Sequence, residues 1–176
     1  MELYRVNGES PAWQRIAYDY IRTDAFVVGQ GIPVEREFEG DGPAEDLEAV
    51  LLVEDHKPVA GLRITYPRGE FAQIQRVATV REKQRGGYGS ILMREAERWI
   101  AEKGFRHILI TSQDRSVGFY EANGYHRLPP ESLDRYFPED AERRRRREEE
   151  RRKNPEAHPG FGFTIILVEK HLNENE

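Results

Sequence analysis

The chain of 176 residues contains no cysteine. This absence excludes disulfides, thiolate nucleophiles and cysteine-based metal sites together. Long hydrophobic runs are also missing, since no apolar stretch approaches the ~20 residues that a membrane-spanning helix needs. The first residues lack the basic start and apolar core of a signal peptide. We therefore expect a cytoplasmic protein without a membrane partner.

An excess of positive charge is absent as well. Lys and Arg number 27 against 32 Asp and Glu, and the net charge is −5. This balance argues against a general nucleic-acid partner or an anionic membrane surface. The length suits one domain with a single core, so we expect one domain over residues 1–176.

The most informative segment is a glycine-rich loop between an expected strand, 71–80, and an expected helix. The loop reads Gln84-Arg85-Gly86-Gly87-Tyr88-Gly89-Ser90. Glycines let the backbone approach an anion closely, and a helix N-terminus adds unpaired N–H groups and the positive end of its dipole. No Lys-Ser or Lys-Thr follows the glycines and no GxGxxG is present, which disfavours P-loop hydrolases and dinucleotide-binding folds. The loop predicts a ligand that carries phosphate.

Other elements follow from periodicity and turn residues. We expect strands at 2–7, 49–53, 59–66, 107–112 and 161–170. Ser10 is the expected N-cap of a first helix, with Pro11 at its first position. The apolar residues of this helix predict one buried face, formed by Trp13, Ile16, Ala17, Tyr20 and Ile21.

Two motifs together resemble the GNAT family of N-acetyltransferases. The Q-x-x-G-x-G pattern from Gln84 to Gly89 resembles the family's acyl-CoA pyrophosphate loop, and FYEANGY at 119–125 resembles its F-Y-x-x-x-G-[FY] element. Asn123 and Gly124 make a good helix stop there. The stretch 21–38 is similar to the ElaA-like branch of the family, although Gly29 stands where that branch commonly carries a glutamate.

The resemblance implies the fold and the activity. The implied fold is the α/β GNAT acyl-CoA N-acyltransferase fold, a mixed twisted sheet with helices on both faces. The implied reaction moves an acetyl group from acetyl-CoA, as co-substrate, to a primary amine of a small molecule or protein by direct attack. The protein would act as a monomer or homodimer, without a metal. A non-catalytic acyl-CoA-binding module and a redesigned scaffold without activity are the alternatives.

The resemblance also assigns residues. Tyr120 matches the general acid. The alternative is that Phe119 and Tyr120 are core aromatics, and the glycine loop favours the catalytic role. Arg22, Gln30 and Glu35 are candidate substrate contacts. The expected acetyl-CoA contacts are Val77, Ala78, Thr79, Gln84, Arg85, Gly86, Gly87, Tyr88, Gly89, Ser90, Gln113 and Phe119. No general base stands out, and candidates by residue type alone are Glu35, Glu54, His56, His107 and His158.

A charged helical insertion is expected at about 130–158, before the last strand. It contains AERRRRREEERRK, in which opposite charges recur at i,i+4 and no apolar stripe is present. One interpretation is a basic patch for RNA or an acidic partner, and the other is a solvated helix. Interleaved acids and the lack of aromatics favour the solvated helix, so we expect no nucleic-acid partner.

Overall fold

The computed structural model describes residues 1–156 and 162–173, and the chain forms two compact units. The first unit comprises Met1–Ile108 together with the chain from His171 onward, and the second comprises Leu109–Lys170. That both belong to one domain over residues 1–176 stays a prediction.

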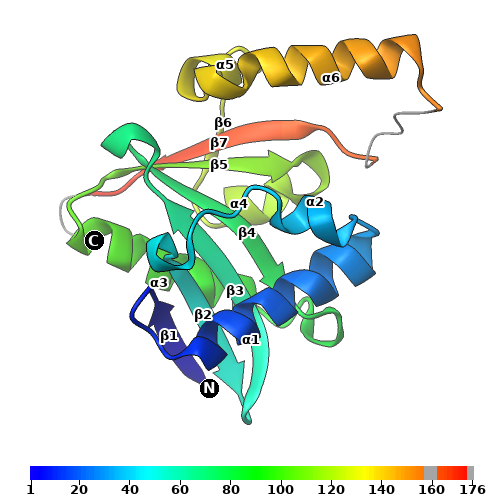
Figure 1. Cartoon of the computed structure of the whole chain (residues 1–176). Helices are drawn as coiled ribbons and strands as arrows, with labels where there is room; N and C mark the ends of the chain where they lie inside the picture. The colour runs from blue at the N-terminus through cyan, green and yellow to red at the C-terminus, as the bar shows by residue number, and fades with distance from the viewer. Residues whose placement is uncertain (157–161, 174–176) are drawn as a thin grey trace. The chain divides into compact units, whose positions relative to one another are not determined.

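Four antiparallel strands form the sheet of the first unit, in the order β1-β2-β3-β4 (Figure 1). A two-residue turn joins β2 to β3 at Asp55 and His56, whose φ angles of +49° and +61° suit a tight hairpin. The sequence predicted all four strands to within two residues at each end. They are β1 (Glu2–Val6), β2 (Ala49–Glu54), β3 (Lys57–Thr65) and β4 (Ala72–Thr79).

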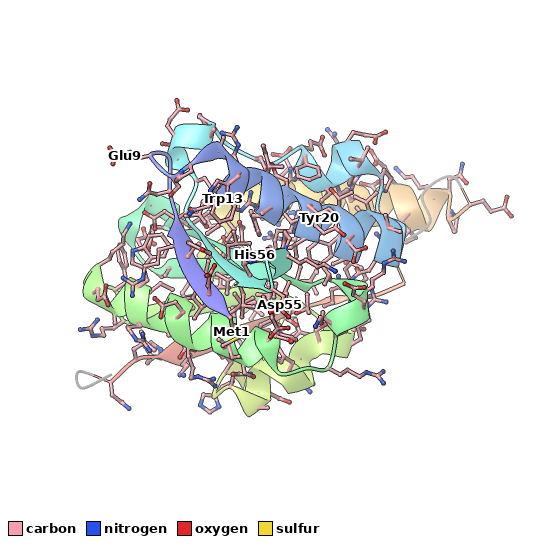
Figure 2. All side chains as sticks on the ribbon, turned by 90° about the horizontal axis from the view of Figure 1, so that it is seen from below. Met1, Glu9, Trp13, Tyr20, Asp55 and His56 are labelled. Atoms are coloured by element: carbon pink, nitrogen blue, oxygen red, sulfur yellow. The ribbon has the colours of Figure 1, made fainter. Side chains whose placement is uncertain are left out.

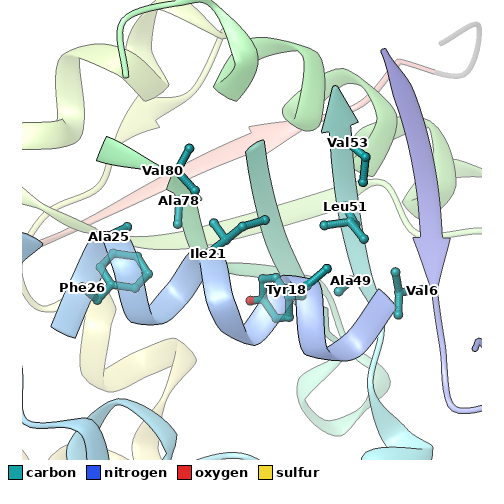
Figure 3. Close-up of a cluster of buried hydrophobic side chains, with 11 residues drawn as sticks. Val6, Tyr18, Ile21, Ala25, Phe26, Ala49, Leu51, Val53, Ala78 and Val80 are labelled. Atoms are coloured by element: carbon teal, nitrogen blue, oxygen red, sulfur yellow. The ribbon is translucent and has the colours of Figure 1, made fainter. Parts of the chain in front are cut away.

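Helices cover both faces of this sheet. α1 (Ala12–Arg22) packs Tyr18 and Ile21 against one face, where they meet the odd-numbered residues of β2 (Figure 3). Side chains alternate along a strand, so Val50 and Leu52 point to the other face, where they are also fully buried. α3 (Tyr88–Glu102) contacts β2, β3 and β4 and covers that second face. A π-helical turn (Thr23–Val28) and α2 (Val34–Phe38) continue the chain beyond α1.

The predicted buried face of α1 is partly wrong. Trp13, Ile16 and Tyr20 are 47 %, 62 % and 56 % exposed, and Figure 2 labels the first and last of them. Tyr18 and Arg22 take the core positions instead, with 0 % and 1 % exposed.

Two features outside the helix explain this rotation. Gly61 of β3 leaves room for the Tyr18 ring, because a Cβ at Gly61 would lie 2.7 Å from a ring carbon. Acidic partners neutralise Arg22, so a charged residue can occupy the core. Ser10 is also not the cap: Pro11 is the N-cap, and the Ser10 hydroxyl accepts the backbone N–H of Asn7 at 2.9 Å.

The second unit contains most of β5 (His107–Gln113) and β7 (Ile165–His171), with β6 (His126–Arg127) antiparallel to β7. α4 (Val117–Ala122) stops at Asn123 and Gly124, as predicted, and Gly124 is left-handed with φ +89°. The last strand begins at Ile165 rather than at Phe161, which lies outside the described residues. Gly162 has a left-handed φ of +76°, which a regular extended strand does not contain.

The charged insertion contains α5 (Ser132–Tyr136) and α6 (Ala141–Lys153). Only Ala141 of α6 is buried, so this part of the insertion is a solvated helix. Two predicted i,i+4 ion pairs are present, Arg146–Glu150 at 3.6 Å and Glu149–Lys153 at 2.6 Å.

Arg144 differs from the prediction. The i,i+4 pattern predicts a pair with Glu148, but the Arg144 Nη2 donates to Asp134 Oδ1 at 2.7 Å and to the Phe137 carbonyl at 2.9 Å. These bonds tie the start of α6 to α5 and the turn that follows α5.

Candidate active site

The glycine-rich loop lies at the surface of the first unit, between β4 and α3. Arg85 and Gly87 both have left-handed φ angles, +66° and +81°. Gly86 is needed for a different reason, since a Cβ there would lie 2.6 Å from a ring carbon of Tyr88. Gln84, Arg85, Gly86 and Gly87 are exposed, so the turn is open to a ligand.

Backbone N–H groups of this loop are available for binding an anion. Within residues 1–156 and 162–173, the amides of Arg85, Gly86 and Gly87 donate to no backbone carbonyl. No side chain caps the N-terminus of α3, a helix of 15 residues whose dipole places partial positive charge at the same point. Unsatisfied donors at a helix N-terminus are the usual means of holding phosphate.

Glu54, at the end of β2, forms hydrogen bonds with side chains at both ends of the loop. Its Oε2 accepts hydrogen bonds from the Tyr88 hydroxyl at 2.8 Å and from Lys83 Nζ at 3.1 Å. These two partners, Tyr88 first, hold the pKa of the Glu54 carboxyl below its usual range. A third bond runs from Gln84 Nε2 to the carbonyl of Thr79 at 3.3 Å. A loop fixed before binding loses less conformational freedom when the ligand arrives.

β4 carries a bulge where the predicted thioester contacts begin. Gly61 pairs with Ala78 and Arg63 pairs with Gln75, so the single residue between the two β3 positions faces two residues of β4, Arg76 and Val77. Arg76 is the left-handed residue of the bulge, with φ +52°. A bulge interrupts the ladder and leaves local backbone groups without a strand partner.

Buried and half-buried ion pairs surround the α1 side of this bulge. Glu37, which is 2 % exposed, accepts Arg22 Nε at 2.9 Å and lies 3.0 Å from Arg76 Nε. Asp41 accepts Arg22 Nη1 at 2.7 Å and Arg63 Nη1 at 2.5 Å. Burial alone would raise the pKa of Asp41, but the two arginines outweigh it and lower that pKa below the usual range. Because opposite charges are paired, the network leaves no buried charge without a partner.

A cleft of about 350 Å³ opens beside this network. α1, the segment 40–47, β3 and β4 form its walls, and Arg15, Asp19 and Arg63 give it charges of both signs. Gln75 lines the cleft and directly precedes the bulge residue Arg76. The volume is that of a small-molecule site, and the cleft reaches the bulge.

Tyr120 lies on α4 in the second unit and is 7 % exposed. Its ring meets those of Phe119 and Tyr125 at centroid distances of 5.0 and 6.1 Å. Burial raises the pKa of the Tyr120 phenol above its usual value of 10, so the group keeps its proton at neutral pH. In the same unit, Gln113 accepts a hydrogen bond from Arg115 Nε at 2.7 Å.

The Acetyltransferase (GNAT) family model matches residues 13–125, well over half of the chain. The chain belongs to the GNAT family. The curated relative YjcF, an N-acetyltransferase of Bacillus subtilis, is 28 % identical over 120 residues, which cover 68 % of this chain and 84 % of the relative. The GNAT protein described here is thus an acetyl-CoA-dependent N-acetyltransferase, as the sequence predicted.

Solved structures have the same fold. Escherichia coli ElaA matches with a TM-score of 0.71 and 18 % identity, over 97 % of this chain and all of that chain. The catalytic domain of the Tetrahymena GCN5 histone acetyltransferase, solved in complex with coenzyme A, matches with a TM-score of 0.62 and 14 % identity. That match covers 98 % of this chain and 93 % of the other. The predicted GNAT fold class is confirmed.

The predicted GNAT site residues fall into three groups. The contacts from Val77 to Ser90 lie together in the first unit, joined by the bond from Gln84 to Thr79. Gln113, Phe119 and Tyr120 lie in the second unit. Of the candidate substrate contacts, Arg22 is buried in ion pairs, whereas Gln30 and Glu35 are exposed.

The candidate bases are also placed, with one exception. Glu54 is held in the loop tether, and His56 is exposed in the β2–β3 turn. The His107 ring stacks on that of His171 at a centroid distance of 4.3 Å. His158 lies outside the described residues. No helix in the described ranges is long and apolar enough to cross a membrane.

Two contacts of this region do not follow from the sequence. Residue type alone makes Glu54 a candidate base, and its partners Lys83 and Tyr88 are remote in sequence. The pairing of Glu37 with Arg76 is likewise a long-range contact. One signal was present: the polar pair Gln75-Arg76 breaks the alternation of β4, which is what a bulge does to a strand pattern.

Proposed function

We propose that this GNAT protein acetylates a primary amine of a small molecule or protein by direct attack of the amine on the thioester of acetyl-CoA. The observation that carries the proposal is the open turn from Gln84 to Ser90, with free amides at the N-terminus of α3 and a tether to Glu54. The coenzyme A complex of the related GCN5 fold supports acetyl-CoA as the co-substrate.

Each segment has a role in this proposal. The amides of the loop hold the pyrophosphate, and Arg85 adds a positive charge. The backbone of Val77, Ala78 and Thr79 holds the pantetheine arm and polarises the thioester carbonyl. Preorganised donors of this kind typically contribute ~2.7–4 kcal/mol to a transition state.

Tyr120 is the proposed general acid. When the amine nitrogen bonds to the carbonyl carbon and the carbon–sulfur bond breaks, the Tyr120 hydroxyl gives its proton to the departing sulfur. The amine proton leaves to water. The buried phenol suits the role because it is fully protonated at neutral pH.

The cleft beside the bulge is the proposed acceptor site. Its volume of about 350 Å³ fits a small amine or a single side chain. Its lining of both arginines and aspartates favours a polar acceptor over an apolar one.

A hydroxyl deletion tests the acid. Tyr120→Phe should lower kcat by about 100-fold or more, the usual contribution of a positioned proton donor, with the KM for acetyl-CoA little changed. Tyr20→Phe, which removes an exposed hydroxyl from α1, is the matched control and should leave kcat unchanged. Undiminished turnover of Tyr120→Phe over a broad amine panel would refute the assignment.

A further inference from the structure

We propose that Glu37 and Arg76 are positioning residues, whose ion pair holds the β4 bulge in the conformation that acetyl transfer needs. The inference rests on the proposed function in one respect, the role of Val77, Ala78 and Thr79 at the thioester. It assigns a task to two residues that lie outside the glycine loop and are not the proposed acid.

The bulge has an unusual residue at its critical position. A bulge whose first residue is left-handed normally carries glycine there, because other residues resist positive φ. This chain has Arg76 at φ +52°. Arg76 could instead adopt the extended conformation of a regular strand. Every following side chain of β4 would then turn to the other face of the sheet. A contact with another residue must therefore hold Arg76 in the left-handed conformation.

Glu37 is placed to do so. Its carboxylate is 2 % exposed and lies 3.0 Å from Arg76 Nε, and Arg22 donates to the same oxygen at 2.9 Å. Arg22 is itself 1 % exposed and bound to Asp41, so its position is fixed and it holds the Glu37 carboxylate in place. If Arg76 moved into the regular strand, its guanidinium would leave a buried acid with one partner fewer, which is costly.

The directions in which the β4 side chains point show the effect of the bulge. Gln75 and Ala78 both face α1, since they pair with Arg63 and Gly61 on β3. In a regular strand these two β4 positions would lie on opposite faces. The extra residue thus brings Gln75 to the acceptor cleft while Ala78 stays in the core against α1.

Two substitutions at one position separate conformation from side-chain chemistry. Arg76→Ala removes the ion pair and still resists positive φ, so kcat should fall by about ten- to 100-fold, as expected when reacting groups are misplaced by about 1 Å. Arg76→Gly also removes the ion pair but adopts positive φ freely, so it should recover most of the lost kcat. The dissociation constant for coenzyme A should rise in Arg76→Ala by a smaller factor than kcat falls, because the pantetheine contacts shift while the phosphate loop is untouched.

Substitutions in α2 complete the test. Glu37→Gln should lower kcat in the same direction as Arg76→Ala. Glu39→Gln, an exposed acid directly after α2, is the matched control and should leave kcat unchanged. Wild-type kcat in Arg76→Ala would overturn the inference. Equal losses in Arg76→Ala and Arg76→Gly would also overturn it, since the arginine would then act through a contact of its own.

A spectroscopic readout keeps the inference separate from the reaction. In proton–nitrogen correlation spectra of the ligand-free protein, Arg76→Ala should shift the amides of Val77, Ala78 and Thr79, and Arg76→Gly should shift them much less. If no amine is acetylated but these shifts appear, the proposed function fails and the bulge assignment stands. Unshifted amides in Arg76→Ala would refute the bulge assignment alone.

Discussion

Replacing Gly87 by alanine tests the phosphate loop with a known energetic penalty. Gly87 has φ +81°, and no atom lies within 4 Å of the position that a Cβ would take. The substitution therefore adds only the backbone penalty of a left-handed residue, about 1–2 kcal/mol. The loop is exposed, so it can relieve this penalty by adopting another backbone conformation. In that conformation its amides would no longer be arranged to bind the diphosphate. The Kd for coenzyme A should consequently rise by a factor of about 5–30.

Gly69→Ala is the matched control for that experiment. Gly69 lies in the turn between β3 and β4, with φ +69° and no atom near a built Cβ. Its backbone penalty is the same, but it is not part of the phosphate loop. Calorimetric titration with coenzyme A should show weaker binding for Gly87→Ala only, while melting curves should show that both variants remain folded. Equal affinities of the two variants would refute the assignment of the loop.

Three further predictions follow from the first unit. Gly61→Ala places a Cβ 2.7 Å from the Tyr18 ring and should destabilise the fold by about 1–3 kcal/mol, seen as a lower melting temperature. Gly40→Ala, with open space around its Cβ, is the control and should have the melting temperature of wild type. A wild-type melting temperature for Gly61→Ala would contradict the packing of α1 on β3. Glu54→Gln should raise the KM for acetyl-CoA severalfold and leave kcat unchanged, because it loosens the loop tether; a change in kcat alone would contradict this role. The lowered pKa of Asp41 means that its stabilising contribution is complete above its ordinary value of 3.8 and is lost as the pH falls through the folded value. Urea midpoints at about pH 6 and about pH 3 should therefore differ less in Asp41→Asn than in wild type, and equal differences would contradict the Asp41 network.

Local motifs made part of the site predictable. The glycine loop and the segment 119–125 combine turn residues and helix ends whose geometry depends on neighbours in sequence, so both appear where the sequence placed them. The strands were predictable for the same reason, because alternation and tight turns are local properties.

Long-range contacts explain what the sequence did not reveal. The rotation of α1 depends on Gly61 and on acids beyond the helix, and apolar periodicity alone pointed to Trp13 and Tyr20. The Glu54–Tyr88 tether and the Glu37–Arg76 pair join residues more than 30 positions apart. Periodicity within single elements contains no information on such pairs.

The most direct test of the account is a titration of the labelled wild-type protein with coenzyme A, followed in proton–nitrogen correlation spectra. The largest shifts should fall on the amides of Arg85, Gly86 and Gly87 and on those of the first turn of α3. If saturating coenzyme A leaves these resonances in place, the loop does not hold the diphosphate and the account is contradicted.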